Sequence, residues 1–150
     1  MADPQAALDR AFEEKNLVLL YQPIHDVTSG AIVAAEALLR QRRETGEIRE
    51  AGIITAAAED GSSGDLFRLD SWVMRAACEA ATTWNGVRLH VNLSPREFEE
   101  GDVLTRLPPF CEPHKLVLEI TETSYIESPE ETMHTLNALN QFERPTLRRH

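Results

Sequence analysis

Apolar runs of strand length alternate along this chain with longer amphipathic stretches, and this alternation constrains the fold more than any other feature. Four segments have the pattern of strands: residues 17–21, 31–39, 87–93 and 116–120. Turn-forming residues separate the first two, which predicts an antiparallel hairpin. Helical patterns separate the later ones, and that order predicts a parallel sheet with right-handed crossovers.

Five further segments have helical patterns: residues 3–16, 53–60, 65–84, 96–101 and 128–142. The longest carries apolar residues three or four positions apart, so one face is expected to pack on the sheet. Asp65 is the expected N-cap of that helix. Residues 41–52 are polar and predict an exposed loop. Residues 143–150 show no apolar periodicity and predict no element.

Composition narrows the function classes. Hydrophobic residues make up 42% and charged residues 27% of the 150-residue chain, which is the balance of a folded soluble domain. The net charge of -10 repels nucleic acid. No apolar run approaches the roughly 20 residues of a membrane span, and the N-terminus lacks the pattern of a secretory signal, so we expect a cytoplasmic protein without membrane contact.

Two cysteines, Cys78 and Cys111, have neither the spacing of a zinc site nor that of a disulfide framework. We therefore expect two reduced thiols. The histidines also lack metal-binding spacing, and His90 is expected to be a core or surface imidazole. Trp72 and Trp84 lie in a helical pattern and are expected to be packing residues.

Three polar residues stand at or near predicted strand ends: Glu36, Asn92 and Glu119. The carboxyl ends of parallel strands face the ligand side of such folds. Carboxylate and amide oxygens suit Mg²⁺ or Mn²⁺, so these residues are candidate metal ligands. The alternative is that Asn92 and Glu119 are solvated or cap the next helix, and spacing alone favours this alternative.

Two more charged residues follow these candidates. Arg40 lies four residues after Glu36, on the same face of an extended strand, where it is placed to clamp a phosphate. The alternative for Arg40 is a surface ion pair. Glu122 lies three residues after Glu119 and is expected either to anchor a catalytic loop or to be solvated.

Five segments, taken in order, resemble the motifs of the EAL domain family: Tyr21-Gln22-Pro23-Ile24, Glu36-Ala37-Leu38-Leu39-Arg40, Leu69-Asp70-Ser71-Trp72-Val73, Val91-Asn92-Leu93-Ser94 and Leu118-Glu119-Ile120-Thr121-Glu122. The resemblance covers roughly residues 17–142. It implies a TIM-like barrel, here truncated, of α/β class with an antiparallel first strand, about four strands and flanking helices. Members hydrolyse one phosphodiester bond of cyclic di-GMP with two divalent metals.

The resemblance also implies roles for individual residues. Glu36, Asn92 and Glu119 are metal ligands, Mg²⁺ or Mn²⁺ being the expected cation. Gln22, Leu38 and Arg40 bind substrate. Glu122 steadies a loop that carries further ligands. No residue of the chain is confidently identified as catalytic.

The paired aspartates and the catalytic lysine that follow in the family are not found in these 150 residues. We therefore expect a partial EAL domain at residues 1–142 with an unrelated tail at 143–150. It is expected to be inactive, to bind cyclic di-GMP weakly or not at all, and to act as a homo-oligomer or through a protein partner. Two alternatives stay open: a phosphodiesterase completed by oligomerisation or by missing residues, and a cyclic di-GMP sensor.

Overall fold

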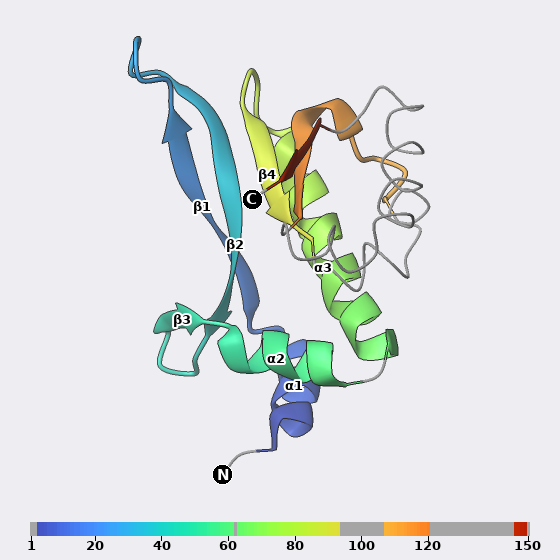
Figure 1. Cartoon of the computed structure of the whole chain (residues 1–150). Helices are drawn as coiled ribbons and strands as arrows, with labels where there is room; N and C mark the ends of the chain where they lie inside the picture. Colours follow the sequence, from blue (N-terminus) through green and yellow to red (C-terminus); the bar gives the residue numbers. More distant parts are fainter. Residues whose placement is uncertain (1–2, 62, 94–106, 121–145, 150) are drawn as a thin grey trace.

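The computed structural model describes residues 3–61, 63–93, 107–120 and 146–149. A sheet runs through this part of the chain, with helices packed on one face and at one end (Figure 1). The elements in chain order are α1 (Pro4–Glu13), β1 (Leu17–His25), β2 (Ile32–Arg42), β3 (Ile48–Glu50), α2 (Gly52–Asp60), α3 (Ser63–Thr82), β4 (Arg88–Asn92), the 3-10 turn η2 (Pro113–Lys115), β5 (Leu116–Ile120) and β6 (Thr146–Arg149).

The sheet has the mixed topology that the sequence predicts. Its order is β1-β2-β4-β5-β6, with β3 pairing to β2 outside this path. β1 runs antiparallel to β2, whereas β2, β4, β5 and β6 are parallel neighbours. The fold is therefore a mixed α/β partial barrel with an antiparallel first strand, as predicted.

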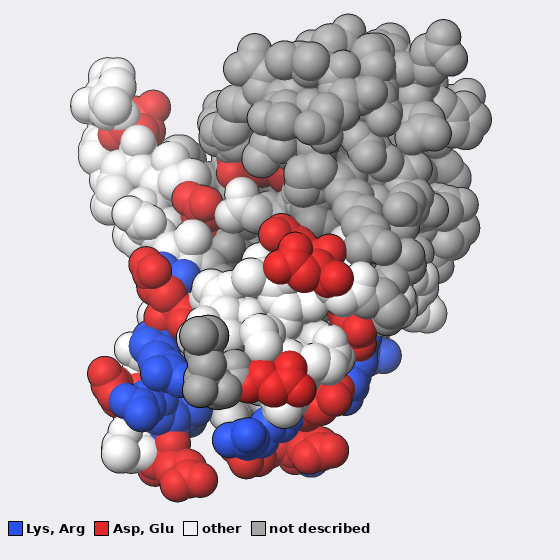
Figure 2. All heavy atoms as spheres, turned by 60° about the horizontal axis from the view of Figure 1, so that its bottom comes forward, with Lys and Arg blue, Asp and Glu red and all other residues white. Residues whose placement is uncertain are grey.

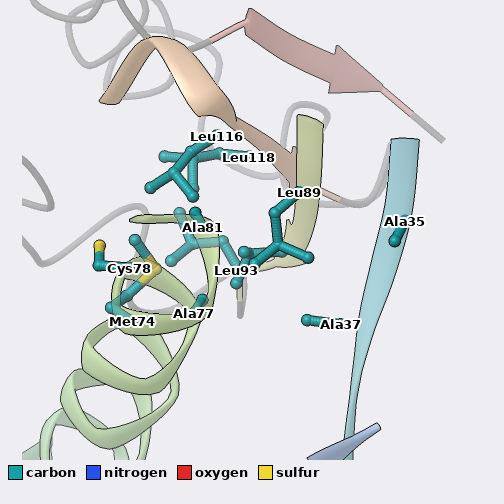
Figure 3. Close-up of a cluster of buried hydrophobic side chains, with 11 residues drawn as sticks. Ala35, Ala37, Met74, Ala77, Cys78, Ala81, Leu89, Leu93, Leu116 and Leu118 are labelled. Carbon is teal, nitrogen blue, oxygen red and sulfur yellow. The ribbon is translucent and has the colours of Figure 1, made fainter. Parts of the chain in front are cut away.

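One face of the sheet packs against α3. Alternate residues of the strands point to this face, including Ala35 and Ala37 of β2 and Leu89 of β4 (Figure 3). They meet Ala77 and other small or apolar residues of α3, which are fully buried or nearly so. Burying a leucine side chain contributes about 1.5–3 kcal/mol, so this layer holds helix and sheet together.

A second apolar cluster joins the helices at one end of the sheet. It contains Leu8 and Ala11 of α1, Ile54 of α2 and Leu69 of α3. Helix α1 begins where expected, because the Asp3 side chain accepts a hydrogen bond from the Gln5 backbone N–H at 3.1 Å. Trp72 packs against this cluster and Trp84 against the first one, so both are packing residues as predicted.

The predicted loop at residues 41–52 was wrong. β2 continues to Arg42 and turns back into β3, with Arg42 paired to Ile48. Gly46 takes the left-handed conformation, φ 85°, that this tight turn requires. All three residues of β3 are exposed, so the pairing depends on main-chain hydrogen bonds. The sequence of β3 therefore shows no alternation of apolar and polar residues. β6 was missed as well, because a four-residue strand can also pair without an apolar pattern.

The prediction of two reduced thiols was also wrong. Cys78 of α3 and Cys111, in the segment before β5, form a disulfide with their Cα atoms 5.0 Å apart. They are 33 residues apart in sequence, and the fold brings them together by packing the segment before β5 onto α3. Sequence spacing alone does not carry that information.

Smaller differences concern the helices. Asp65 lies inside the first turn of α3 instead of capping it. The predicted helices at 96–101 and 128–142 lie outside the described residues. Among the helices that the structure describes, none is long and apolar enough to cross a membrane.

Candidate functional site

The face of the sheet opposite α3 carries the polar residues. Glu36 of β2 is the register partner of His90 of β4, and Asn92 of β4 is the partner of Glu119 of β5. Register partners share a face, and so do residues two apart in one strand. All four side chains therefore belong to one face, which we call the polar face.

Glu36 and Asn92 are in direct contact across β2 and β4. The Asn92 Nδ2 amide donates a hydrogen bond to Glu36 Oε1 at 3.1 Å. The Glu36 side chain is half-buried and Asn92 is exposed. This bond orients the Asn92 amide, because donating through Nδ2 fixes where its oxygen points. Asn92 is thus both exposed to solvent and bonded to Glu36.

Glu119 pairs with a residue that sequence reasoning did not place in the site. His90 Nδ1 lies 2.6 Å from Glu119 Oε1, and the two side chains are only 7% and 6% exposed. A buried carboxylate needs hydrogen-bond donors, and the imidazole N–H supplies one. The signal that could have found His90 is its position two residues before Asn92, which puts both on the same face.

The predicted substrate-binding residues surround Glu36 on β1 and β2. Gln22 is the register partner of Glu36 and is exposed. Leu38 and Arg40 follow Glu36 at even spacing, so they belong to the polar face. Arg40 is half-buried, and its Nη1 donates to the backbone oxygen of Leu39 at 2.8 Å. Within the described residues Arg40 makes no ion pair.

Tyr21, next to Gln22, packs on the opposite face of β1, toward α3. Its ring meets Trp84 edge to face, with the ring centroids 4.8 Å apart. Burial raises the pKa of the Tyr21 hydroxyl, and the negative charge of Glu79 raises this pKa further. Tyr21 is therefore a neutral packing residue that holds the strand carrying Gln22 against α3.

The donor set of the polar face fits a hard cation. Glu36 and Glu119 offer carboxylate oxygens, and Asn92 offers an amide oxygen. Among the described residues, no three His, Cys, Asp or Glu side chains are grouped closely enough to hold a metal ion. The described part thus supplies two carboxylates and one amide. Glu122 lies outside the described residues.

Comparison with known families settles the classification. Residues 5–143 match the EAL domain. The chain belongs to the EAL domain family. A protein of Synechocystis, sll1895, is 34% identical over 143 residues. The match covers 89% of this chain but 20% of that protein.

Two solved structures of EAL proteins have a similar fold. The PaMucR phosphodiesterase in complex with cyclic di-GMP is 26% identical, with a TM-score of 0.79 over 92% of this chain and 59% of that one. The YkuI protein of Bacillus subtilis, solved with its substrate cyclic di-GMP and calcium, is 21% identical with a TM-score of 0.77. That match covers 98% of this chain and 38% of YkuI, and it shows the fold alone.

The chain therefore spans about a fifth of that curated relative and roughly two to three fifths of the two solved chains. The EAL family, the relation to cyclic di-GMP phosphodiesterases and the partial barrel predicted from the sequence are confirmed.

Proposed function

We propose that the polar face of this EAL segment is part of a divalent-metal site of the phosphodiesterase type, with Glu36, Asn92 and Glu119 as ligands. The observation that carries the proposal is the hydrogen bond from Asn92 to Glu36, on the face that also holds Glu119. The calcium in the YkuI complex supports a divalent cation, and Mg²⁺ or Mn²⁺ suits the same oxygen donors.

Each ligand has a separate task in this proposal. Glu36 and Glu119 bring the negative charge that attracts the cation, and the Asn92 amide is held in place by its bond to Glu36. His90 donates to Glu119 and orients it, as a second partner commonly orients a metal-binding side chain. When bound, the metal supplies an activated water for attack on a phosphodiester.

The substrate of this site is proposed to be cyclic di-GMP, the ligand of the PaMucR complex. Gln22 and Leu38 lie beside Glu36 on β1 and β2, where they line the approach to the metal. Arg40 is placed to neutralise a phosphate once its side chain leaves the Leu39 carbonyl.

We further propose that these 150 residues do not hydrolyse cyclic di-GMP on their own and act through protein contacts. The sequence contains no adjacent pair of aspartates, which the resemblance to the family calls for. The described part supplies only two carboxylates, Glu36 and Glu119, and two-metal hydrolysis needs more acidic ligands than these.

A second candidate is a phosphodiesterase completed by a further segment or by a second copy. One observation favours it: β1 and β6 are the two ends of the described sheet, and no described strand joins them. Leu20, Ile32 and Val33 of the β1–β2 hairpin expose 42–50% of their surface, and a neighbouring segment would cover these apolar side chains.

A paired assay separates the two candidates. The purified chain is incubated with cyclic di-GMP and Mg²⁺ or Mn²⁺, and nucleotides are resolved by chromatography while sedimentation gives the oligomeric state. We expect an oligomer that binds cyclic di-GMP weakly and forms no linear product. Turnover that Glu36→Gln abolishes and Arg75→Gln preserves establishes the second candidate and contradicts the first.

A further inference from the structure

A cavity of about 310 Å³ lies at the end of the molecule where α1, β3 and α2 meet the end of β2. Four arginines line it: Arg10 from α1, Arg42 and Arg43 from the end of β2 and its turn, and Arg49 from β3. Ile53 and Ile54 of α2 form an apolar wall. Figure 2, which brings this end forward, shows Lys and Arg side chains gathered there among carboxylates.

Three of the four arginines of this cavity have no ion-pair partner among the residues that the structure describes. Within the described residues Arg10, Arg42 and Arg49 make no ion pair, and Arg43 is bonded to Glu47 at 3.3 Å. Two acidic residues, Glu14 and Glu44, also line the cavity, so positive charge predominates in a chain whose net charge is -10. Guanidinium groups brought together repel one another, and a bound anion relieves that repulsion.

The backbone around the arginines is held in place. The Arg42 N–H donates to the Asn16 carbonyl at 2.7 Å, which ties the end of β2 to the start of β1. The Arg43 N–H donates to the Glu47 carbonyl and the Gly46 N–H to the Arg43 carbonyl, both at 2.8 Å. A ligand that binds here therefore meets a preformed turn, and less ordering entropy opposes binding.

The chemistry of the cavity selects a class of ligand. Guanidinium groups bind phosphate through two parallel hydrogen bonds. Elsewhere the acidic surface of the chain repels a phosphate. The volume is at the small end of the range for small-molecule sites. The wall formed by Ile53 and Ile54 suits a flat apolar body next to the phosphate.

We propose that the cavity lined by Arg10, Arg42, Arg43 and Arg49 is a binding site for a phosphomonoester of the nucleoside monophosphate class. It lies apart from the metal site, since Arg42 follows Glu36 by six residues of β2, a separation of about 20 Å along an extended strand. This site does not depend on a metal or on hydrolysis.

The test uses adenosine monophosphate as the probe, with adenosine and inorganic phosphate as separate arms, in EDTA so that the metal site stays silent. Binding is followed by titration calorimetry and by the chemical shifts of the Arg42 and Arg49 amides. We expect adenosine monophosphate to bind at least about tenfold more tightly than adenosine, because the phosphate makes the charged contacts. Inorganic phosphate is expected to bind more weakly but to shift the same amides.

Two variants locate the binding. Arg42→Gln combined with Arg49→Gln is expected to lose at least about tenfold in affinity, whereas Arg75→Gln, on the exposed surface of α3, is expected to bind like the parent chain. If the double variant fails to fold, Arg10→Gln replaces it, since Arg10 is exposed and unpaired in the described part. Equal binding of adenosine, equal loss in Arg75→Gln, or the same shifts with sodium chloride at matched ionic strength overturns the proposal.

Discussion

The two faces of the sheet are built from the same strands by opposite rules. Toward α3, alternate residues in the middle of the sheet are alanine, leucine and valine and are 5% exposed or less: Ala35, Ala37, Leu89, Val91, Leu116 and Leu118. On the polar face the intervening positions include Glu36, His90, Asn92 and Glu119. Both faces share one backbone, so a single register determines the core and the site together.

The difference teaches which substitutions affect stability and which affect chemistry. The face toward α3 depends on close packing, where a missing side chain leaves a cavity. The polar face depends on hydrogen bonds between named pairs, where a missing side chain changes the orientation of its partner. Stability and ligand binding should therefore respond to different positions along the same strand.

The largest effect is expected on the face toward α3. Leu89→Ala should lower the free energy of unfolding by about 2–5 kcal/mol, because Leu89 is fully buried against α3. Urea unfolding followed by circular dichroism measures this. Val27→Ala is the matched control, since Val27 is fully exposed at the hairpin turn and should change little. Equal effects at the two positions would mean that this face is not the core.

The next largest effect on the free energy of unfolding is expected from the disulfide. Reducing Cys78–Cys111 removes a link across 33 residues and should lower the free energy of unfolding by about 2–4 kcal/mol, because the unfolded chain regains freedom. Unfolding curves with and without a phosphine reductant measure it. Cys111→Ser, which cannot form the link, should be insensitive to the reductant. A parent chain that is equally insensitive contradicts the crosslink.

A smaller effect is expected on the polar face. His90→Ala should cost about 1–3 kcal/mol, because the buried carboxylate of Glu119 loses a hydrogen-bond donor. His114→Ala serves as the control, since His114 is exposed. The two are compared in the same urea series, and indistinguishable curves would show that the His90–Glu119 contact does not stabilise the fold.

The sequence predicted the frame of the fold, and it predicted site residues that remain candidates, for identifiable reasons. β1, β2, β4 and β5 have apolar runs, and α3 has a helical stripe, so packing leaves a readable pattern. Glu36 and Asn92 were predicted as candidates because strand ends in parallel sheets converge, although Glu36 lies inside β2 and not at its end. β3 and β6 were missed because main-chain pairing leaves no such pattern, and the disulfide because it depends on tertiary contact.

His90 shows where residue type misleads. A histidine without metal-binding spacing was expected to be a core or surface residue, and it is indeed buried. Its partner, however, is the candidate ligand Glu119, which only the pairing of β4 with β5 reveals. Side-chain partners across parallel strands depend on register, and sequence patterns locate register less well than they locate strands.

The most direct test of the proposed metal site is titration with Mn²⁺ followed by nuclear magnetic resonance. Paramagnetic broadening should appear first at the amides of Glu36, Asn92 and Glu119, while Thr28 at the hairpin turn stays sharp. Glu36→Gln should require at least about tenfold more Mn²⁺ for the same broadening, because one charged ligand is lost. Broadening spread equally over the acidic surface, or unchanged in Glu36→Gln, would contradict a metal site on the polar face.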